Sequence, residues 1–219
     1  MVRVQRMHEW AVGEEEAVAI QRRLRDRVRV TDDHGPIRRV AGLDVAYRDP
    51  DIAVGVVTVL DSDSLAVIDR AVVRERIEFP YISGLFAFRE VPALTRALET
   101  LSVEPDALIC DGHGLAHPRR FGLAAHLGVL TGLPSIGVAK NFHGPHTEPG
   151  RGRGDWSPLL DGGETVGRAL RTQPGVKPVF VSVGHRFTLD TACALVLRLA
   201  PRYRLPETTR TADHLGRLA

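Results

Sequence analysis

The stretch Ala107–Lys140, which contains two predicted strands and the helix between them, reads ALICDGHGLAHPRRFGLAAHLGVLTGLPSIGVAK. The apolar run at 107–110 predicts a short buried strand. Residues 121–130 place apolar side chains at helical spacing, and the apolar run at 133–139 predicts a second strand. A right-handed crossover makes the two strands of such a β-α-β unit parallel. The stretch therefore predicts an α/β fold.

Both strands of this unit end in an ionisable side chain. Asp111 follows the first strand and Lys140 follows the second. Parallel strands end at the same sheet edge, so the two positions should lie roughly 5 Å apart if the strands are adjacent, or 10 Å if one strand intervenes. The connection GHGLAHPRRFG is rich in glycine, histidine and arginine, a composition suited to close backbone approach and phosphate contact. The alternative interpretation of this unit alone is a nucleotide-binding fold with ordinary turn glycines.

Upstream of this unit, the pattern predicts a helix, three strands and another helix. The turns between the strands are the short polar clusters RDPD and DSDS, which predict an antiparallel meander. The arginines of the first helix are interpreted as a solvated face rather than as phosphate contacts. The predicted helices span 14–28 and about 85–101, and the predicted strands span 40–47, 53–60 and 66–75.

Downstream of the unit, the segment 141–158 (NFHGPHTEPGRGRGDWSP) lacks periodicity. It predicts a long loop that could form a phosphate-facing flap, and plain disorder is the alternative. The remaining predicted elements are strands at 165–172 and 179–183, a turn at 182–185, a helix at about 189–200 and a terminal helical segment at 207–219.

Composition indicates one sizeable core, so we expect a single catalytic domain over residues 1–219. The chain has 219 residues, of which 43% are hydrophobic. Cys110 and Cys193 lie in apolar runs without metal-like spacing, which indicates reduced packing residues and a cytoplasmic protein. No apolar window is long enough for a signal peptide or a membrane span. The near balance of 29 basic and 27 acidic residues permits nucleic-acid binding without requiring it.

Three acidic residues interrupt apolar surroundings. Asp44 breaks the strand AGLDVAY, Glu90 lies near the start of the helix after FPYISG, and Asp111 ends its strand. A buried carboxylate is costly unless it is paired or bound to a cation, although a lone Asp44 could instead cap a backbone amide. The order meander, helix, strand, helix, strand is that of a ribonuclease-H-like mixed sheet, in which the first and fourth strands are neighbours. Asp44 and Asp111 could then share one Mg²⁺ or Mn²⁺ ion suited to phosphodiester hydrolysis.

Four motifs carry a resemblance to a known family. LDVAY, FPYISGLFAFRE, DGHGLAHPRRFGLAAHLG and IGVAK together resemble the endonuclease V family of deoxyinosine-directed repair nucleases. The resemblance extends from the first helix to the ADH near the C-terminus. It implies a ribonuclease-H-like core and Mg²⁺-dependent cleavage of the second phosphodiester bond 3′ to inosine, leaving 3′-hydroxyl and 5′-phosphate ends.

The resemblance assigns a catalytic group. Asp44 and Asp111 match the metal-binding aspartates, and Glu90 matches the acid that completes the cluster. Lys140 matches a lysine that meets the scissile phosphate. Asp213 falls where family members carry an Asp or a His near the site.

The resemblance also assigns nucleic-acid contacts. Tyr81 matches the wedge that fills the gap in the duplex when the base is flipped out. Leu85, Gly112 and Gly122 match parts of the pocket that holds hypoxanthine, largely through backbone atoms. His117 matches a histidine of the DNA-contacting loop. We expect a monomer whose partner is DNA that contains deoxyinosine, with no membrane association.

The chain departs from the family pattern at two positions. Ser83 stands in PYISG where proline is expected, so the wedge lacks proline's fixed φ. His113 stands between two glycines where Gln is common, and it could alter base preference or simply face solvent.

Three competing functions remain open at this level. The chain could act on inosine in RNA or on branched and flap structures, because base flipping and phosphate binding make similar demands on both nucleic acids. It could also be a binding module without turnover. A metabolic α/β enzyme is disfavoured, because neither G-x-G-x-x-G after a first strand nor a G-K-[S/T] phosphate loop is present.

Overall fold

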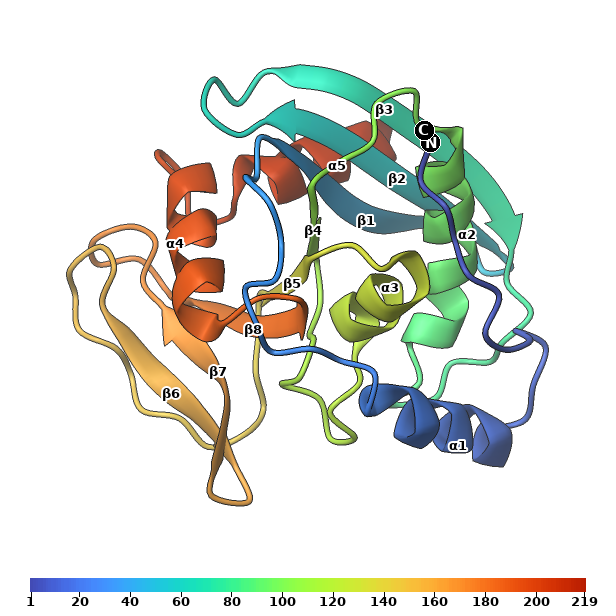
Figure 1. The fold of residues 1–219 in the computed structure, drawn as a ribbon, viewed down its shortest axis with the longest axis horizontal. Coiled ribbons are helices and arrows are strands. Elements are labelled where there is room, and N and C mark those ends of the chain that lie inside the picture. Colours follow the sequence, from blue (N-terminus) through green and yellow to red (C-terminus); the bar gives the residue numbers. More distant parts are fainter.

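The computed structural model describes residues 1–219 and is built on one mixed sheet of eight strands (Figure 1). The strand order is β3-β2-β1-β4-β5-β8-β7-β6. The strands span Arg39–Asp49 (β1), Ile52–Asp61 (β2), Val67–Arg76 (β3), Ala107–Cys110 (β4), Ser135–Ala139 (β5), Trp156–Asp161 (β6), Glu164–Leu170 (β7) and Val179–His185 (β8).

The pairing of the strands confirms the predicted ribonuclease-H-like sheet. β1, β2 and β3 form the antiparallel meander, while β1 pairs in parallel with β4 and β4 in parallel with β5. Leu43 lies opposite Cys110 in the β1–β4 pair, so the next residues, Asp44 and Asp111, come at the same end of two neighbouring strands. Beyond β5 the direction changes, because β8 is antiparallel to β5 and β7 and β6 continue antiparallel.

Helices cover both faces of the sheet. α2 and α3 share an apolar cluster with β1, β2 and β4, while α4 packs against β7 and β8 and α5 against β1 and β2. α1 lies outside α3, at the bottom of Figure 1, in a further apolar cluster with the start of α2. The helices span Glu14–Arg25 (α1), Ala87–Thr100 (α2), Leu123–Thr131 (α3), Leu189–Leu199 (α4) and Glu207–Leu218 (α5).

Two strand predictions were wrong. β6 was not predicted, because its residues 156–158 were placed in the long loop and 159–161 were unassigned. It is a short edge strand whose one strand partner is β7, and Gly162 and Gly163, both at positive φ, form the tight turn between the two strands. The turn predicted at 182–185 is instead part of β8. Gly184 does not turn the chain there, and it is needed because a Cβ would lie 2.4 Å from the Ser135 hydroxyl oxygen and 2.8 Å from the Ala124 carbonyl oxygen.

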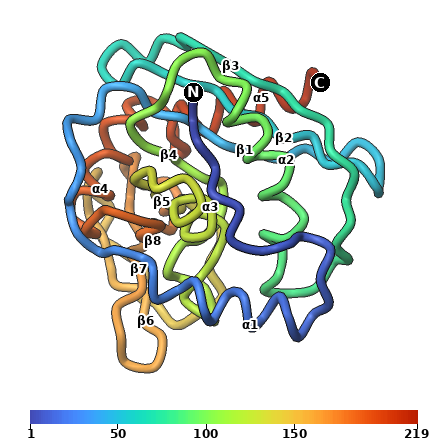
Figure 2. The backbone as a smooth tube through the Cα atoms, turned by 45° about the vertical axis from the view of Figure 1, so that its right-hand side comes forward, coloured from blue at the N-terminus to red at the C-terminus, as the bar shows by residue number.

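Helix boundaries also shift by two or three residues. α1 ends at Arg25 rather than at 28, and α2 begins at Ala87 rather than at 85 because a turn precedes it, with the Leu85 N–H donating to the Ile82 carbonyl. Figure 2 shows the N-terminal segment running beside α3 toward α1, and the β6–β7 hairpin projecting at the lower left. Every helix is too short or too polar to cross a membrane.

Candidate active site

Two aspartates and a lysine meet where β1, β4 and β5 approach the same edge of the sheet. The Asp111 N–H donates to the Leu43 carbonyl (3.2 Å), which keeps Asp111 beside the residue that precedes Asp44. Lys140 directly follows β5, and its Nζ donates to Asp111 Oδ2 at 2.5 Å. Burial lowers the pKa of Lys140, but the hydrogen bond and the charge of Asp111 outweigh it and leave that pKa raised. The lysine is therefore a stable cation at this edge.

Glu90 faces the same site from the first turn of α2. Its side chain is buried, and the Tyr47 hydroxyl donates to Oε1 at 3.2 Å. Burial raises the pKa of Glu90 to about 8; the charges of Asp44 and Asp111 add to the rise, and the Tyr47 hydrogen bond opposes it. Such a carboxyl group needs either a proton or a cation at neutral pH.

The surroundings of Asp44 also favour its protonated form. Burial raises its pKa to about 6, and the neighbouring charge of Asp111 adds to this rise. Lys140 opposes the shift, whereas Asp213 contributes to it. Asp213 on α5 therefore lies close enough to influence Asp44, as the sequence prediction required, although no direct bond joins the two carboxylates.

The position of Asp213 depends on how tightly α5 packs against β1. A Cβ on Gly42 would lie 2.1 Å from the Thr208 carbonyl oxygen, so only glycine permits this approach. Asp213 itself pairs with Arg217 one turn later on the same helix (2.9 Å). The small residue in β1 thus determines how near α5 brings its acid to the site.

The donor chemistry of the site fits a divalent cation. Asp44, Glu90 and Asp111 offer hard carboxylate oxygens, and the raised pKa values of Asp44 and Glu90 show that these charges lack sufficient compensation. No three acidic, histidine or cysteine side chains converge as a ready-made cage. Mg²⁺ does not require one, because it commonly uses one or two carboxylates and completes its shell with water and substrate phosphate. Asp44 and Asp111 would hold the ion, with Glu90 behind them.

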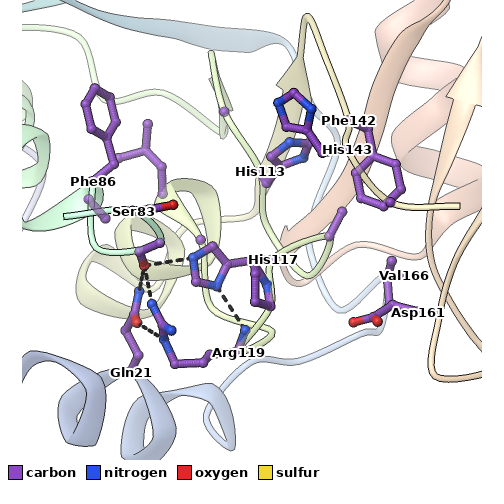
Figure 3. A pocket seen from close by; sticks show the side chains of 18 of the residues that line it. Gln21, Ser83, Phe86, His113, His117, Arg119, Phe142, His143, Asp161 and Val166 are labelled. Atoms are coloured by element: carbon purple, nitrogen blue, oxygen red, sulfur yellow. Dashed lines mark hydrogen bonds between the residues drawn. The ribbon is translucent and has the colours of Figure 1, made fainter. Parts of the chain in front are cut away.

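A cavity of about 630 Å³ opens beside Glu90 and Asp111. Figure 3 shows Ser83 and Phe86 on one side and Phe142, Asp161 and Val166 on the other. Its lining comes from Gln21 on α1, the segment before α2 and the first turn of α2, the loop between β4 and α3, the loop after β5 and the β6–β7 hairpin. The cavity is large enough to receive a nucleobase with part of its sugar-phosphate.

The long loop predicted at 141–158 contributes to this cavity and ends at 155, because β6 begins at Trp156. Phe142 and His143 line the cavity. Farther along, the buried Arg171 donates from Nε to the Gly150 carbonyl at 2.7 Å, which attaches the far half of the loop to β7. The second half of the loop is thus fixed by Arg171, while its first residues line the cavity.

Tyr81 and Leu85 belong to one segment but lie in opposite environments. The Tyr81 residue is 73% exposed, and its ring makes an edge contact with Phe86 at 5.8 Å between centroids. Leu85 is fully buried in the apolar cluster beneath α1, so its side chain does not line the cavity. An exposed ring on a loop with a buried anchor is the geometry that a wedge requires.

Gly112 and Gly122 both border the cavity, as the base-pocket assignment required. A Cβ on Gly122 would lie 2.3 Å from the His113 carbonyl oxygen, so the loop after β4 can rest on the start of α3 only because residue 122 is glycine. The Gly122 N–H donates to the Gly114 carbonyl at 3.0 Å. His113 also lines the cavity rather than facing solvent, with its ring 5.8 Å from Phe142.

His117 faces the wedge segment. Its Nδ1 accepts a hydrogen bond from the Arg119 N–H (3.2 Å), so Nε2 carries the proton and donates to the Gly84 carbonyl at 2.9 Å (Figure 3). Burial, reinforced by the charge of Arg119, lowers the pKa of His117 to about 4. His117 is therefore neutral at physiological pH and joins two loops of the cavity.

Comparison with known proteins identifies the family. A family model described as Endonuclease V matches residues 22–214. The chain belongs to the endonuclease V family. An endonuclease V from Streptomyces coelicolor is 58% identical over 215 residues, which cover 96% of this chain and 92% of that protein. The family resemblance seen in the sequence is thereby confirmed, and the chain is a nuclease.

Solved structures agree with this endonuclease V assignment. The crystal structure of the endonuclease V from Streptomyces avermitilis matches with a TM-score of 0.92 and 54% identity, covering 100% of this chain and 96% of that one. The endonuclease V from Ciona intestinalis, crystallised with a 24mer DNA containing an inosine followed by a ribo-adenosine, matches with a TM-score of 0.82 and 27% identity. That match covers 93% of this chain and 96% of that one.

Four residues of this family member contribute to the site without having been identified from the sequence. Tyr47 continues the alternation 41, 43, 45 along β1, which places it on the face that α2 covers, and this signal could have identified it. Gln21 is a polar residue on the apolar stripe of α1 and could have been found in the same way. The composition of the loop after β4 indicated phosphate contact for its arginines, whereas Arg119 bonds to Gln21 and Gly84 within the protein. Nothing in the local pattern marks Arg204, whose Nη2 donates to the Lys140 carbonyl at 2.7 Å.

Proposed function

We propose that this protein is a Mg²⁺-dependent DNA repair endonuclease that recognises deoxyinosine and hydrolyses the second phosphodiester bond 3′ to it, leaving 3′-hydroxyl and 5′-phosphate ends. The observation that carries the proposal is the group of buried Glu90 with the partly buried Asp44, Asp111 and Lys140, placed beside a cavity of base-accommodating size. The crystallisation of the Ciona intestinalis protein with inosine-containing DNA supports the substrate. The cleavage position rests on the family resemblance. We propose that the protein acts as a monomer.

Each residue then has a defined task. Asp44 and Asp111 would hold the cation, and ionised Glu90 would supply a further negative charge behind them. When bound, Mg²⁺ or Mn²⁺ supplies Lewis-acid stabilisation of phosphate charge and lowers the pKa of a bound water. Lys140 places a cationic Nζ at the same edge, where it can contact the scissile phosphate and stabilise charge that develops on it.

The nucleic-acid contacts follow from the surroundings of the cavity. The flipped base enters between Gly112 and Gly122, where the absence of side chains permits close approach of the backbone. Tyr81 stacks into the space that the base leaves in the duplex. This wedge supplies an apolar surface in place of the lost stacking partner.

The test is a cleavage-mapping experiment. End-labelled oligonucleotides with one deoxyinosine, one ribo-inosine or an adenine at the same position are incubated with the protein in Mg²⁺ or in EDTA, and the cut is mapped to the nucleotide. We expect Mg²⁺-dependent cleavage of the deoxyinosine strand at the second phosphodiester bond 3′ to the lesion. Binding without cleavage would indicate a non-catalytic module, and cleavage confined to ribo-inosine would indicate an endoribonuclease.

A further inference from the structure

One backbone carbonyl beside the cavity collects an unusual number of donors. The Gly84 carbonyl accepts hydrogen bonds from Gln21 Nε2 (3.1 Å), from His117 Nε2 (2.9 Å) and from the Arg119 guanidinium. Figure 3 shows these side chains converging below Ser83. Gly84 has φ +77°, and a Cβ there would lie 2.7 Å from Arg119 Nη2. The backbone conformation favours glycine at this position, and a Cβ would also displace the Arg119 guanidinium from the carbonyl.

Gln21 is the member of this group that belongs to neither cavity loop. It lies on α1 and is fully buried, and its Nε2 also donates to the Phe121 carbonyl at 3.1 Å. Its Oε1 accepts a hydrogen bond from Arg119 Nε. Gln21 borders the cavity, but both of its amide hydrogens are engaged by backbone carbonyls and its fully buried Oε1 accepts from Arg119. We therefore assign Gln21 a role that acts through these partners.

Gln21 adds α1 to a junction between two segments that His117 and Arg119 also join directly through the Gly84 carbonyl. One is the wedge segment 79–86, which has no helix or strand and carries the exposed Tyr81 three residues before Gly84. The other is the segment 112–122 that borders the cavity and carries Arg119. Gln21 contacts a carbonyl in each of them, at Gly84 and at Phe121.

We propose that Gln21 is a positioning residue of this nuclease, which holds the wedge segment at a fixed distance from the base-binding loop through the Gly84 carbonyl. The inference rests on the proposed function. A wedge helps only if its ring arrives where the flipped base leaves the stack, and this requires the two loops to keep one relative position. Flipping from a duplex costs a few kcal/mol, whereas a single strand has little pairing or stacking to lose. Loss of the Gln21 contacts should therefore impair duplex cleavage selectively.

Two substitutions separate this role from a general contribution to folding. Gln21→Met keeps a similar volume in the apolar cluster and removes all three hydrogen bonds. Gln21→Glu keeps an acceptor for Arg119 but turns carboxylate oxygens toward two carbonyl oxygens, which eliminates the donor to Gly84. The matched control is Gln173→Ala, because Gln173 also donates to two backbone carbonyls, those of Ala200 (2.8 Å) and Tyr203 (3.3 Å), and does not line the cavity.

The measurement is the single-turnover cleavage rate on one inosine-containing sequence, as a duplex and as a single strand, at a temperature well below each variant's melting midpoint. We expect the duplex-to-single-strand rate ratio to fall about tenfold in both Gln21 variants, the effect of roughly 1.4 kcal/mol, and to stay unchanged in Gln173→Ala.

The outcomes distinguish a failure of the proposed function from a failure of the positioning role of Gln21. A wild-type protein that does not cleave inosine substrates overturns the proposed function and this inference together. If the wild type is active and either Gln21 variant keeps the wild-type ratio, the positioning role is refuted while the proposed function stands. Equal losses on duplex and single strand would also refute it, since a purely structural contribution lowers both rates alike.

Discussion

Glu90 makes the stability of the metal-free protein depend on pH in a direction opposite to that of most carboxyl groups. Burial raises its pKa from the ordinary 4.5 to about 8, so the folded protein holds a proton that the unfolded chain has already released at neutral pH. The contribution of Glu90 to folded stability must then decrease as the pH rises toward 8. The substitution Glu90→Gln keeps a neutral group that can still contact Tyr47 and removes this titration.

The size of the effect follows from the two pKa values. Between pH 6.5 and 8.0, a group with pKa values of 4.5 unfolded and about 8 folded loses about 2 kcal/mol of its contribution to the free energy of unfolding. Five histidines act in the opposite direction over the same range. Burial lowers the pKa of His117 and His185 to about 4 and also lowers the pKa of His8, His113 and His126, and because the ordinary pKa is about 6.5, each still adds a few tenths of a kcal/mol of stability above pH 6.5. The loss from Glu90 is therefore measured as the difference between the wild type and Glu90→Gln. For a chain of this size, the loss corresponds to a fall in melting temperature of roughly 4–8 °C.

The assay is thermal unfolding in EDTA at pH 6.5, 7.0, 7.5 and 8.0 for three proteins. Across this range the melting temperature of the wild type should fall relative to that of Glu90→Gln, because the histidines contribute equally to both proteins. Glu99→Gln, which alters an exposed glutamate near the other end of α2, should follow the wild type. Parallel pH profiles for the wild type and Glu90→Gln would refute the argument, because they would mean that Glu90 is already ionised in the folded protein.

Added Mg²⁺ gives the same experiment a second readout that does not depend on catalysis. A cation held by Asp44 and Asp111 near ionised Glu90 favours the deprotonated cluster and stabilises only the folded state. The gain in melting temperature on adding Mg²⁺ should therefore be larger at pH 8.0 than at pH 6.5. An equal gain at both values would place the ion away from Glu90.

Four further substitutions test the site and its support. Asp111→Asn should reduce Mg²⁺-dependent cleavage by at least roughly a hundredfold, since even partners of metal ligands contribute 10–100-fold, and near-normal nicking would remove the end of β4 from the active site. Lys140→Ala should lower the single-turnover rate by about a hundredfold with little change in substrate binding. Lys177→Ala, which replaces the chain's other lysine, should change neither quantity. Equal losses in rate and in binding would mean that Lys140 contacts the phosphate only in the ground state. Tyr81→Ala should slow cleavage of an inosine duplex by about 1–3 kcal/mol more than cleavage of a single strand, with Tyr81→Phe milder, and an unchanged duplex-to-single-strand ratio would exclude the wedge. Gly42→Ala should destabilise the protein to urea by about 1–3 kcal/mol, because its Cβ would collide with α5, and a null effect would mean that α5 shifts without cost.

The sequence alone was sufficient to predict the site residues that lie at the ends of neighbouring strands. Apolar runs that end in a charged residue identify strand ends, and the right-handed crossover rule places Asp111 and Lys140 at one edge. The meander places Asp44 beside Asp111 once β1 and β4 are recognised as neighbours. Local periodicity reports which face a residue occupies, and in this chain that information was enough to predict the central sheet and its acidic edge.

The tertiary structure decided what lies opposite those faces. The bond from Tyr47 to Glu90, the approach of α5 that brings Asp213 near Asp44, and the attachment of Gln21 to Gly84 join residues 43 to 169 positions apart. Periodicity carries no information about such partners, because a buried polar side chain is compatible with any donor or acceptor that the fold supplies. The antiparallel return of β8 and the edge strand β6 were missed for the same reason, since pairing between distant segments is a property of the folded chain.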